Sequence, residues 1–351
     1  MGSRHHFVPR FYLSAFQSAP KQIGLLNLSR GQVVLGASLR DQCYVHRLYG
    51  SDEIESALAG IEGVAAALFR DVRDRHAIPG AGTAERHALL LFIALQLSRT
   101  TAAQENVLKS SQLLADVAFD DAPPSDFALS ARAAMRLALG ASPMIAATIQ
   151  DMAATLILAS EGTAFVISDH PVFKYNMFCE GITDFGVIGT KCRGLQVFVP
   201  ISPQVLLYLF DAGVYKLVRP DSDPAIANWD DVKSLNSLQL VGAHENVYFH
   251  DPQLGSWLAK TAQSVQSMRD QRNPRVTRAV DAQDDRSELL HEYWPMPQLD
   301  LRLSFVSMRS NARQIPLFER ARQRRTPYQR NNPQPDAVHG NVRRFEVRSR
   351  H

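Results

Sequence analysis

Cysteine is scarce in this chain of 351 residues, which contains only Cys43, Cys179 and Cys192. A small and odd number of thiols argues against a disulfide framework and favours reduced cysteines. A zinc site formed by His170, Cys179 and Cys192 is conceivable, but the spacing fits no zinc pattern and the chain has no CxxC pair. The cysteine content therefore predicts a cytoplasmic protein.

Long apolar runs are also missing. The longest, residues 88–95, spans eight positions, and residues 152–159 are apolar apart from Thr155, whereas a membrane-spanning helix needs about twenty. No charged start followed by an apolar stretch marks a secretory signal. The sequence therefore predicts no membrane partner.

Complete catalytic motifs are absent as well: the chain contains no phosphate loop, GxGxxG, GxSxG or HExxH. Asp231-x-Lys233 loosely resembles the acid-spacer-lysine pattern of metal-dependent nucleases. Such triplets arise often by chance, and this one falls at a predicted helix start. The candidate functional residues are therefore polar side chains that lie within apolar segments.

Acidic residues are rare at the C-terminal end. Residues 301–351 hold twelve arginines, no lysine and three acids, a net charge of +9. Because the whole chain carries +3, residues 1–300 carry −6. Guanidinium groups bind phosphate through a bidentate fork. We therefore predict an arginine-rich, partly disordered segment over 301–351 that contacts nucleic acid, with a merely solvated tail as the alternative.

Hydrophobic spacing predicts a mixed α+β fold, in which a central helical block packs on a small, mainly antiparallel sheet. The predicted helices are 9–17, 52–78, 84–118, 125–139, 143–159, 224–245 and 254–268. The predicted strands are 22–28, 32–35, 43–48, 164–167, 195–199, 205–210, 214–218, 247–249 and 301–308. We expect one globular domain over 5–268, made of an N-terminal hairpin, a helical block (about 52–159) and a strand-rich part (about 163–250). Residues 269–300 are predicted to be a loop and linker.

The N-terminal segment combines titratable groups with aromatic residues. His5, His6 and Arg10 stand among Phe7, Phe11 and other apolar residues. The apolar residues should draw this segment into a core, so the polar groups need partners. Neighbouring histidines in an extended segment point to opposite sides and would not chelate one ion together.

A second candidate is the turn Ser168-Asp169-His170-Pro171, directly after a predicted apolar strand. Side chains at the carboxyl end of a buried strand commonly face a ligand crevice. Asp169 could bind a metal or orient a histidine there. The alternative is an Asx turn, in which Asp169 bonds nearby backbone amides.

Two predicted helices carry further polar residues. Gln96 and Arg99 lie on one face of a strongly apolar helix and need partners. Arg99 could clamp a phosphate or pair with Asp169. Asn236 and Gln239 share the face of another helix, and Asn is unfavourable in a helix interior.

Five blocks of the chain, taken in order, resemble a bacterial family known as domain of unknown function 4238. They are 5–13, 92–100, 165–172, 199–203 and 235–239, in a match over roughly residues 5–250. The family name assigns no activity. The resemblance implies that the same polar residues form a common feature of the family.

The leading hypothesis is a phosphodiester hydrolase, a nuclease-like bacterial toxin or defence effector. Its catalytic residues would be His5, His6, Arg99 and Asp169, its substrate-binding residues Arg10, Gln96, Ser168 and Asn236, and Asp169 with His6 would hold Mg²⁺ or Mn²⁺. The rival is a non-catalytic module that binds a nucleotide, nucleic acid or partner protein. A third possibility is a buried network that only fixes the fold. The functional hypotheses require the N-terminal histidines, Arg10, Gln96, Arg99 and Asp169 to converge on one cleft.

Overall fold

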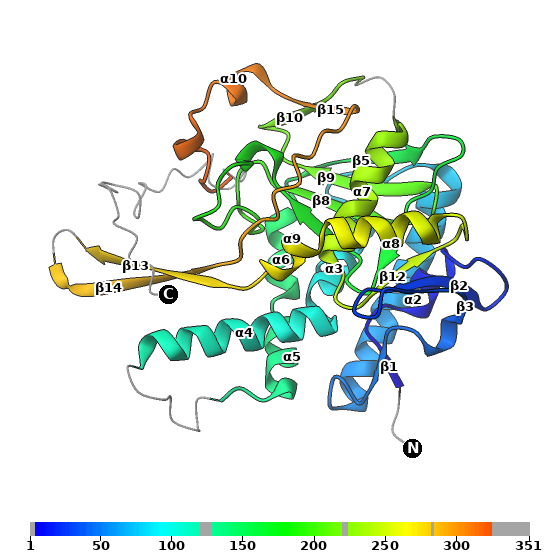
Figure 1. Ribbon diagram of the computed structural model, residues 1–351, viewed down its shortest axis with the longest axis horizontal. Helices are drawn as coiled ribbons and strands as arrows, with labels where there is room; N and C mark the ends of the chain where they lie inside the picture. Colours follow the sequence, from blue (N-terminus) through cyan, green and yellow to red (C-terminus); the bar gives the residue numbers. More distant parts are fainter. Residues whose placement is uncertain (1–3, 120–127, 220–223, 282–283, 325–351) are drawn as a thin grey trace.

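The computed structural model describes residues 4–119, 128–219, 224–281 and 284–324 (Figure 1). Within them, the helices are α1 (Arg10–Ser14), α2 (Asp52–Arg75), α3 (Ala84–Ser98), α4 (Thr101–Ala118), α5 (Ala131–Gly140), α6 (Ser142–Ile149), α7 (Trp229–Gly242), α8 (Leu254–Ser264), α9 (Gln266–Asp270) and α10 (Ser310–Arg313). The strands are β1 (Arg4–His6), β2 (Gln22–Asn27), β3 (Gln32–Ser38), β4 (Tyr44–His46), β5 (Ala153–Ala159), β6 (Ile167–Ser168), β7 (Phe173–Tyr175), β8 (Gln196–Pro200), β9 (Val205–Phe210), β10 (Tyr215–Leu217), β11 (Ala225–Ala227), β12 (Asn246–Phe249), β13 (Arg275–Asp281), β14 (Asp284–Tyr293) and β15 (Val306–Met308). The predicted mixed α+β class is confirmed.

A five-stranded sheet in the order β11-β5-β9-β8-β7 forms the centre of the molecule. Its neighbouring strands are antiparallel, except that β11 and β5 are parallel. Every residue of β9 is buried, and alternate side chains enter two different apolar clusters. A strand covered on both faces has a continuous apolar sequence, which explains the run Val205–Phe210.

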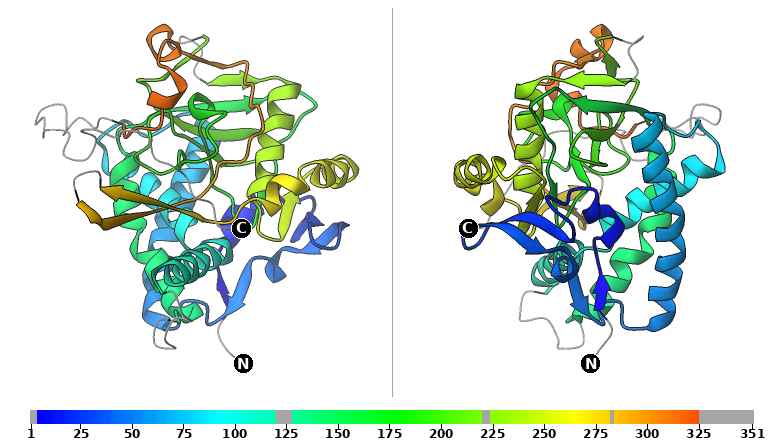
Figure 2. Two further views of the ribbon diagram at one scale, coloured as in Figure 1. Left: turned by 60° about the vertical axis from the view of Figure 1, so that its left-hand side comes forward. Right: turned by 90° about the vertical axis from the view of Figure 1, so that its right-hand side faces the viewer.

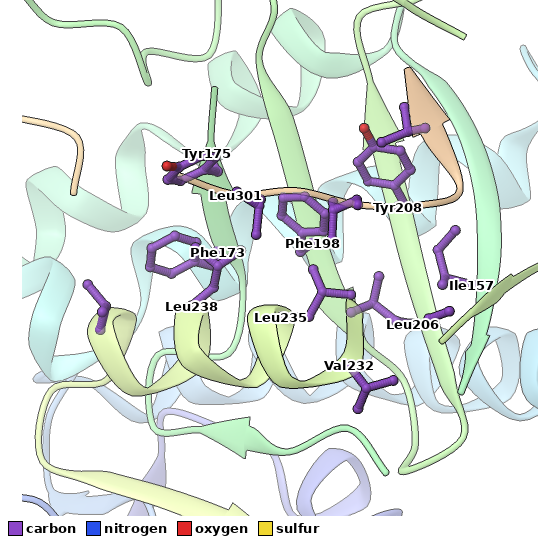
Figure 3. Close-up of a cluster of buried hydrophobic side chains, with 14 of the residues drawn as sticks. Ile157, Phe173, Tyr175, Phe198, Leu206, Tyr208, Val232, Leu235, Leu238 and Leu301 are labelled. Atoms are coloured by element: carbon purple, nitrogen blue, oxygen red, sulfur yellow. The ribbon is translucent and has the colours of Figure 1, made fainter. Parts of the chain in front are cut away.

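Helix α7 covers one face of this sheet. Figure 3 shows Val232, Leu235 and Leu238 of α7 beside Phe198 and other side chains of the sheet, with Leu301 from the C-terminal part at the same cluster. The opposite face packs against α3 and α6, whose buried residues share the second apolar cluster. Two layers of helix thus enclose the sheet, one on each face (Figure 2).

A second, four-stranded antiparallel sheet has the order β3-β2-β12-β6. It joins the N-terminal hairpin to a strand near residue 247, and Asn27 Nδ2 donates to Asn246 Oδ1 across 219 positions of the chain. The short strand β1 pairs with β4, which places His5 opposite Val45. These pairings bring the chain start beside the turn that follows β6.

The helix predicted over 84–118 is in fact two helices, α3 and α4, separated at Arg99 and Thr100. Thr100 has extended backbone angles (φ −84°, ψ 161°), and its hydroxyl accepts a hydrogen bond from Ala103 N–H. A threonine N-cap therefore starts a new helix inside the apolar pattern. No helix in the described ranges is both long and apolar enough to cross a bilayer.

The helix predicted over 143–159 is wrong beyond Ile149, because Ala153–Ala159 forms β5 between β11 and β9. A short apolar run fits a buried strand and a buried helix equally well, so periodicity alone could not separate them. The helix predicted over 125–139 begins at Ala131, with Ser130 as its N-cap. Residues 125–127 lie outside the described part.

Two further predictions are corrected C-terminal to residue 220. Residues 225–227 form strand β11, and α7 starts only at Trp229, where Asn228 and Asp231 make a capping box. The predicted loop over 269–300 contains the end of α9 and a hairpin of β13 and β14, which extends beside α4 in Figure 1. These strands are rich in polar and charged residues, a composition typical of loops, so the sequence pattern does not reveal their pairing.

The arginine-rich segment is partly integrated into the fold. Leu301, Leu303 and Phe305 are buried in the same apolar cluster as α7. Arg324 pairs with Asp151 at 2.9 Å, and both side chains are almost completely buried. This ion pair lines a cleft of about 330 Å³. The tail predicted beyond residue 324 lies outside the described residues.

Candidate functional site

Arg99, at the end of α3, is completely buried. Its Nη1 lies 2.7 Å from Glu62, its Nε donates to the Tyr49 hydroxyl at 3.0 Å, and its Nη2 donates to the His6 carbonyl at 2.7 Å. A buried guanidinium is stable only when its charge and donors are matched. These contacts tie strand β1 to α2 and α3. We use the name Arg99 network for His5, Tyr49, Glu55, Glu62 and Arg99.

The two N-terminal histidines point to different surroundings, as their spacing predicts. His5 is buried, stacks on Tyr49 at 5.4 Å between ring centroids, and has Nδ1 3.6 Å from Glu55. His6 Nε2 is 3.2 Å from the carbonyl oxygen of Arg40. Burial lowers the pKa of His6. The imidazoles are thus held by internal contacts on opposite sides of the strand.

Arg10 and Gln96 differ in their access to solvent. Arg10 is exposed at the start of α1. Gln96 is fully buried on α3, and neither atom of its amide makes a hydrogen bond within the described residues. A buried amide without a partner is costly and calls for a specific explanation. Of the two, only Arg10 can reach solvent from its position.

Asp169 acts as a backbone anchor. Its carboxylate accepts hydrogen bonds from the N–H groups of His244 (2.7 Å), Glu245 (2.7 Å) and Asn246 (2.9 Å). Burial raises the pKa of Asp169, although the three amide hydrogen bonds oppose that shift. The arrangement resembles the Asx-turn alternative, except that the amides belong to the distant loop between α7 and β12.

Ser168, Asn236 and Gln239 hold the same turn from the other side. Asn236 accepts from Val166 N–H and donates to the Ala164 carbonyl, both at 2.9 Å. The strand predicted over 164–167 is in fact β6, Ile167–Ser168, and the Asn236 amide bonds the backbone just before it. Ser168 donates to Gln239 Oε1 at 2.8 Å, and Gln239 Nε2 donates to the Pro171 carbonyl. These side chains therefore hold the backbone of residues 164–171 in place.

The predicted site residues therefore divide into two groups. His5, His6 and Arg99 come together around Tyr49, whereas the hydrogen bonds of Asp169 go to the loop after α7. The groups meet where α3 gives way to α4. Thr100, adjacent to Arg99, has its hydroxyl 2.7 Å from His170 Nδ1.

A basic cluster, not predicted from the sequence, surrounds this second group. His244 lies between the Asp169 turn and α4, with Nδ1 3.3 Å from Glu105. Arg269 and Arg272 approach the C-terminal end of α7, where Arg269 donates to the carbonyls of Ala243 and His244 and Arg272 donates to those of Val241 and Ala243. Lys174 extends from β7. We define the basic cluster as His170, Lys174, His244, Arg269 and Arg272.

The charges of this cluster act on one imidazole. Burial lowers the pKa of His170 to about 3, and the positive charges of Arg272, Lys174 and His244 contribute to the shift. Burial also lowers the pKa of Lys174. Both residues are half-buried rather than sealed from solvent. At neutral pH His170 is therefore an uncharged imidazole among cations.

Sequence reasoning missed Lys174, His244, Arg269 and Arg272 because each stands in a segment without an unusual local pattern. Lys174 lies in a three-residue edge strand, and the two arginines lie in residues predicted to form a loop. The i,i+3 spacing of Arg269 and Arg272 was the one available signal, since it places both on the same side of a helical turn.

The residues predicted to hold a divalent metal do not fit that role together. Both oxygens of Asp169 already accept backbone hydrogen bonds, and His6 contacts the carbonyl of Arg40. In the part of the chain that the structure describes, no three His, Cys, Asp or Glu side chains gather as metal ligands do. With these contacts in place, Asp169 and His6 do not form a common metal site.

Comparison with known proteins adds a family but no activity. No curated protein and no solved structure matches the chain. The model of one family, described as protein of unknown function (DUF4238), matches residues 4–253. The match covers β1, the Arg99 network, the Asp169 turn and His244, and it ends before α8. The chain therefore belongs to the DUF4238 family.

Proposed function

We propose that this protein binds a phosphate-bearing ligand, a nucleotide or nucleic acid, at the basic cluster. The observation that supports this is an excess of positive charge in a half-buried place. Lys174, Arg269 and Arg272 carry three positive charges, against the carboxylates of Asp169 and Glu105. Phosphate is the ligand class that such a set of donors recognises.

The two carboxylates are already engaged. Asp169 is bonded to three backbone amides, and Glu105 pairs with Lys109 at 2.8 Å as well as with His244. Lys174 makes no hydrogen bond or ion pair within the described residues. Because its charge is uncompensated by a neighbour, an anionic ligand would relieve it.

The helix α4 supplies a further contribution. Its first turn begins at Thr100, which contacts His170. A helix N-terminus carries a partial positive charge and free N–H groups, both of which favour an anion. His170 also offers Nε2, which makes no hydrogen bond within the described residues.

If the protein is the predicted phosphodiester hydrolase, with a toxin or defence role, its active site lies elsewhere than at the residues predicted from the sequence. His5, His6, Arg99 and Asp169 are committed to internal contacts, so a reaction would take place at the basic cluster. Up to residue 324, the arginine-rich segment offers less free positive charge for binding nucleic acid than its composition suggests. Arg309, Arg320 and Arg324 donate to backbone carbonyls or to Asp151.

The test is binding of fluorescein-labelled RNA and single-stranded DNA, followed by anisotropy at several salt concentrations. Lys174→Gln removes one cluster charge from a side chain that holds no structural bond, and Lys216→Gln removes one from an exposed side chain on β10. We expect at least about a tenfold loss of affinity for Lys174→Gln and a smaller salt slope, with Lys216→Gln like wild type. Equal affinities for both variants, or no binding by wild type, would overturn the proposal.

A further inference from the structure

We propose that the cleft of about 330 Å³ beside the buried Arg324–Asp151 ion pair binds a free α-amino acid with a short aliphatic side chain. In this site Arg193 holds the carboxylate of the ligand and Asp211 holds its ammonium group. The inference goes beyond the proposed function, because no residue of the basic cluster lines this cleft. It assigns the chain a second site with a different class of ligand.

Two distant parts of the chain form the walls of the cleft. Residues 211–214, the turn between β9 and β10, line one side. The opposite side is lined by Asn311, Ala312 and Ile315 at the C-terminal end of the described chain. Figure 1 shows α10, which carries the first two of these, next to β10 and β15. This second wall lies beyond residues 4–253, so the family match covers only part of the site.

Backbone hydrogen bonds fix the C-terminal wall on the rest of the fold. The N–H group of Arg193 donates to the Arg322 carbonyl at 2.8 Å, and that of Arg324 donates to the Lys191 carbonyl at 2.6 Å. The Arg324 guanidinium adds two hydrogen bonds of 2.9 Å to the carboxylate of Asp151. Because these contacts involve no ligand, the cleft is formed in advance, which lowers the entropic cost of binding.

Arg193 is the group that binds an anion. Its side chain is partly exposed and makes no hydrogen bond or ion pair within the described residues. Arg324, the other arginine of the cleft, differs because its guanidinium is engaged with Asp151 and with the carbonyls of Thr148 and Thr190. A free guanidinium matches a carboxylate through two parallel N–H donors. The cleft therefore offers one site for a carboxylate.

Asp211 is the group that binds a cation. The residue is only 5% exposed, and its Oδ2 and Oδ1 accept hydrogen bonds of 2.9 Å from the N–H groups of Gly194 and Gly213. Each carboxylate oxygen has two lone pairs, so each can accept a second hydrogen bond. Among the described side chains, no cation forms an ion pair with Asp211. A ligand ammonium group would supply the charge that this buried carboxylate lacks.

The charges of the cleft select a zwitterion. Arg324 and Asp151 neutralise each other at 2.9 Å. Arg193 and Asp211 line the same cleft, but no ion pair joins them. A ligand with one charge would match only one of these two groups. An α-amino acid carries both charges on neighbouring atoms and matches both, without changing the net charge of the site.

The remaining lining sets the size and polarity of the ligand side chain. Val214 and Ala312, each 2% exposed, and the partly buried Ile315 form an apolar surface. No aromatic residue is among the described residues that line the cleft. Its volume is at the lower end of the range for small-molecule sites, about 300–1,000 Å³. Valine or a similar amino acid therefore suits the cleft better than a peptide or a nucleotide.

The experiment is isothermal titration calorimetry of the full chain with L-valine and with two analogues that each lack one charged group. Isovalerate has no ammonium group, and isobutylamine has no carboxylate. We expect valine to bind, and each analogue to bind roughly tenfold to a hundredfold more weakly, because each loses one charge-assisted interaction. The comparison tests both charged groups of the site without altering the protein.

Variants assign each charge of the ligand to its residue. Arg193→Gln keeps the backbone bond to Arg322 and should lose the preference for valine over isobutylamine. Asp211→Asn should lose the preference for valine over isovalerate. Arg313→Gln removes an exposed arginine of α10 that does not line the cleft, so its affinity for valine should equal that of the wild type.

The contrary outcomes are as specific. Absence of valine binding by the wild type overturns the proposal, and so does equal affinity for valine and isovalerate. If Arg193→Gln keeps the wild-type preference for valine over isobutylamine, the carboxylate is bound elsewhere and the assigned site is wrong. All of these results leave phosphate binding at the basic cluster untouched, because the two sites share no residue.

Discussion

The Arg99 network and the basic cluster lie on either side of one break between two helices, yet their charges are treated in opposite ways. In the network, the single buried guanidinium is met by a carboxylate, a hydroxyl and a carbonyl. In the cluster, half-buried cations outnumber the carboxylates, which already accept hydrogen bonds or pair with other cations. Arg269 and Arg272 also donate to backbone carbonyls, whereas Lys174 makes no hydrogen bond within the described residues. Saturated polar groups indicate a structural role, whereas unsaturated charge open to solvent indicates a place for a ligand.

The largest expected effect is in the network. Arg99→Met leaves Glu62 and the His6 carbonyl without their partner, so the free energy of unfolding should fall by about 3–5 kcal/mol. Urea denaturation followed by circular dichroism measures this. Arg40→Met removes an arginine that is largely exposed and should change stability by less than about 0.5 kcal/mol. An unchanged midpoint for Arg99→Met would contradict the structural role.

The next effect is a pH dependence that belongs to the cluster. The unfolded chain protonates His170 near 6.5, whereas the folded state resists protonation down to about 3. The unfolded state therefore binds more protons below pH 6.5, and stability is lost as the pH falls. His170→Gln should remove roughly 2 kcal/mol of the loss between pH 6.5 and 4.5. Parallel stability curves for the two proteins would refute this.

A smaller effect separates two buried glutamines. Gln239 bonds Ser168 and Pro171, so Gln239→Met should cost about 1–3 kcal/mol. Gln96 makes no hydrogen bond within the described residues, so Gln96→Met should be neutral or slightly stabilising. Thermal denaturation of the two variants measures this difference, and the substitution is the same in both, a buried glutamine replaced by methionine. Equal losses would mean that Gln96 has a partner, such as an ordered water molecule.

The smallest effect is the response to a simple anion. Inorganic phosphate at ten times its dissociation constant should stabilise the wild-type protein by about 1.4 kcal/mol. Lys174→Gln should respond less, and Arg99→Lys, which alters only the network, should respond like wild type. A thermal shift of the same size in the wild type and Lys174→Gln would place the anion elsewhere.

The sequence predicted the α+β class and the polar residues that matter for the fold, because both depend on local pattern and burial. Periodicity found α2, α8, the strands of the four-stranded sheet, and β8 and β9 of the central sheet. It failed at β5, where a run that is apolar apart from Thr155 has no distinguishing period, and it missed the short strands β7 and β11. It also failed at β13 and β14, whose polar sequence is typical of a loop. It also missed Thr100 as a cap inside a continuous helical pattern.

The candidate site was harder to predict than the fold, because its residues acquire meaning only from long-range contacts. Asp169 was recognised as significant, but its partners are the amides of residues 244–246. Nothing local to Asp169 reveals them. The sequence around Lys174 has no unusual feature. Its significance depends on Arg272, almost a hundred positions later in the chain, whose charge acts on the same imidazole, that of His170.

The pairing of β2 with β12 has a consequence for synthesis of the chain. The hairpin of β2 and β3 leaves the ribosome early, but the strand that covers its inner edge ends only at Phe249. Until then the edge of β2 presents open N–H and C=O groups and apolar side chains, the combination that promotes association between chains. For most of translation, the open edge of β2 in one nascent chain can therefore pair with that of a chain on a neighbouring ribosome. A chaperone that shields the first forty residues would raise the yield of folded protein.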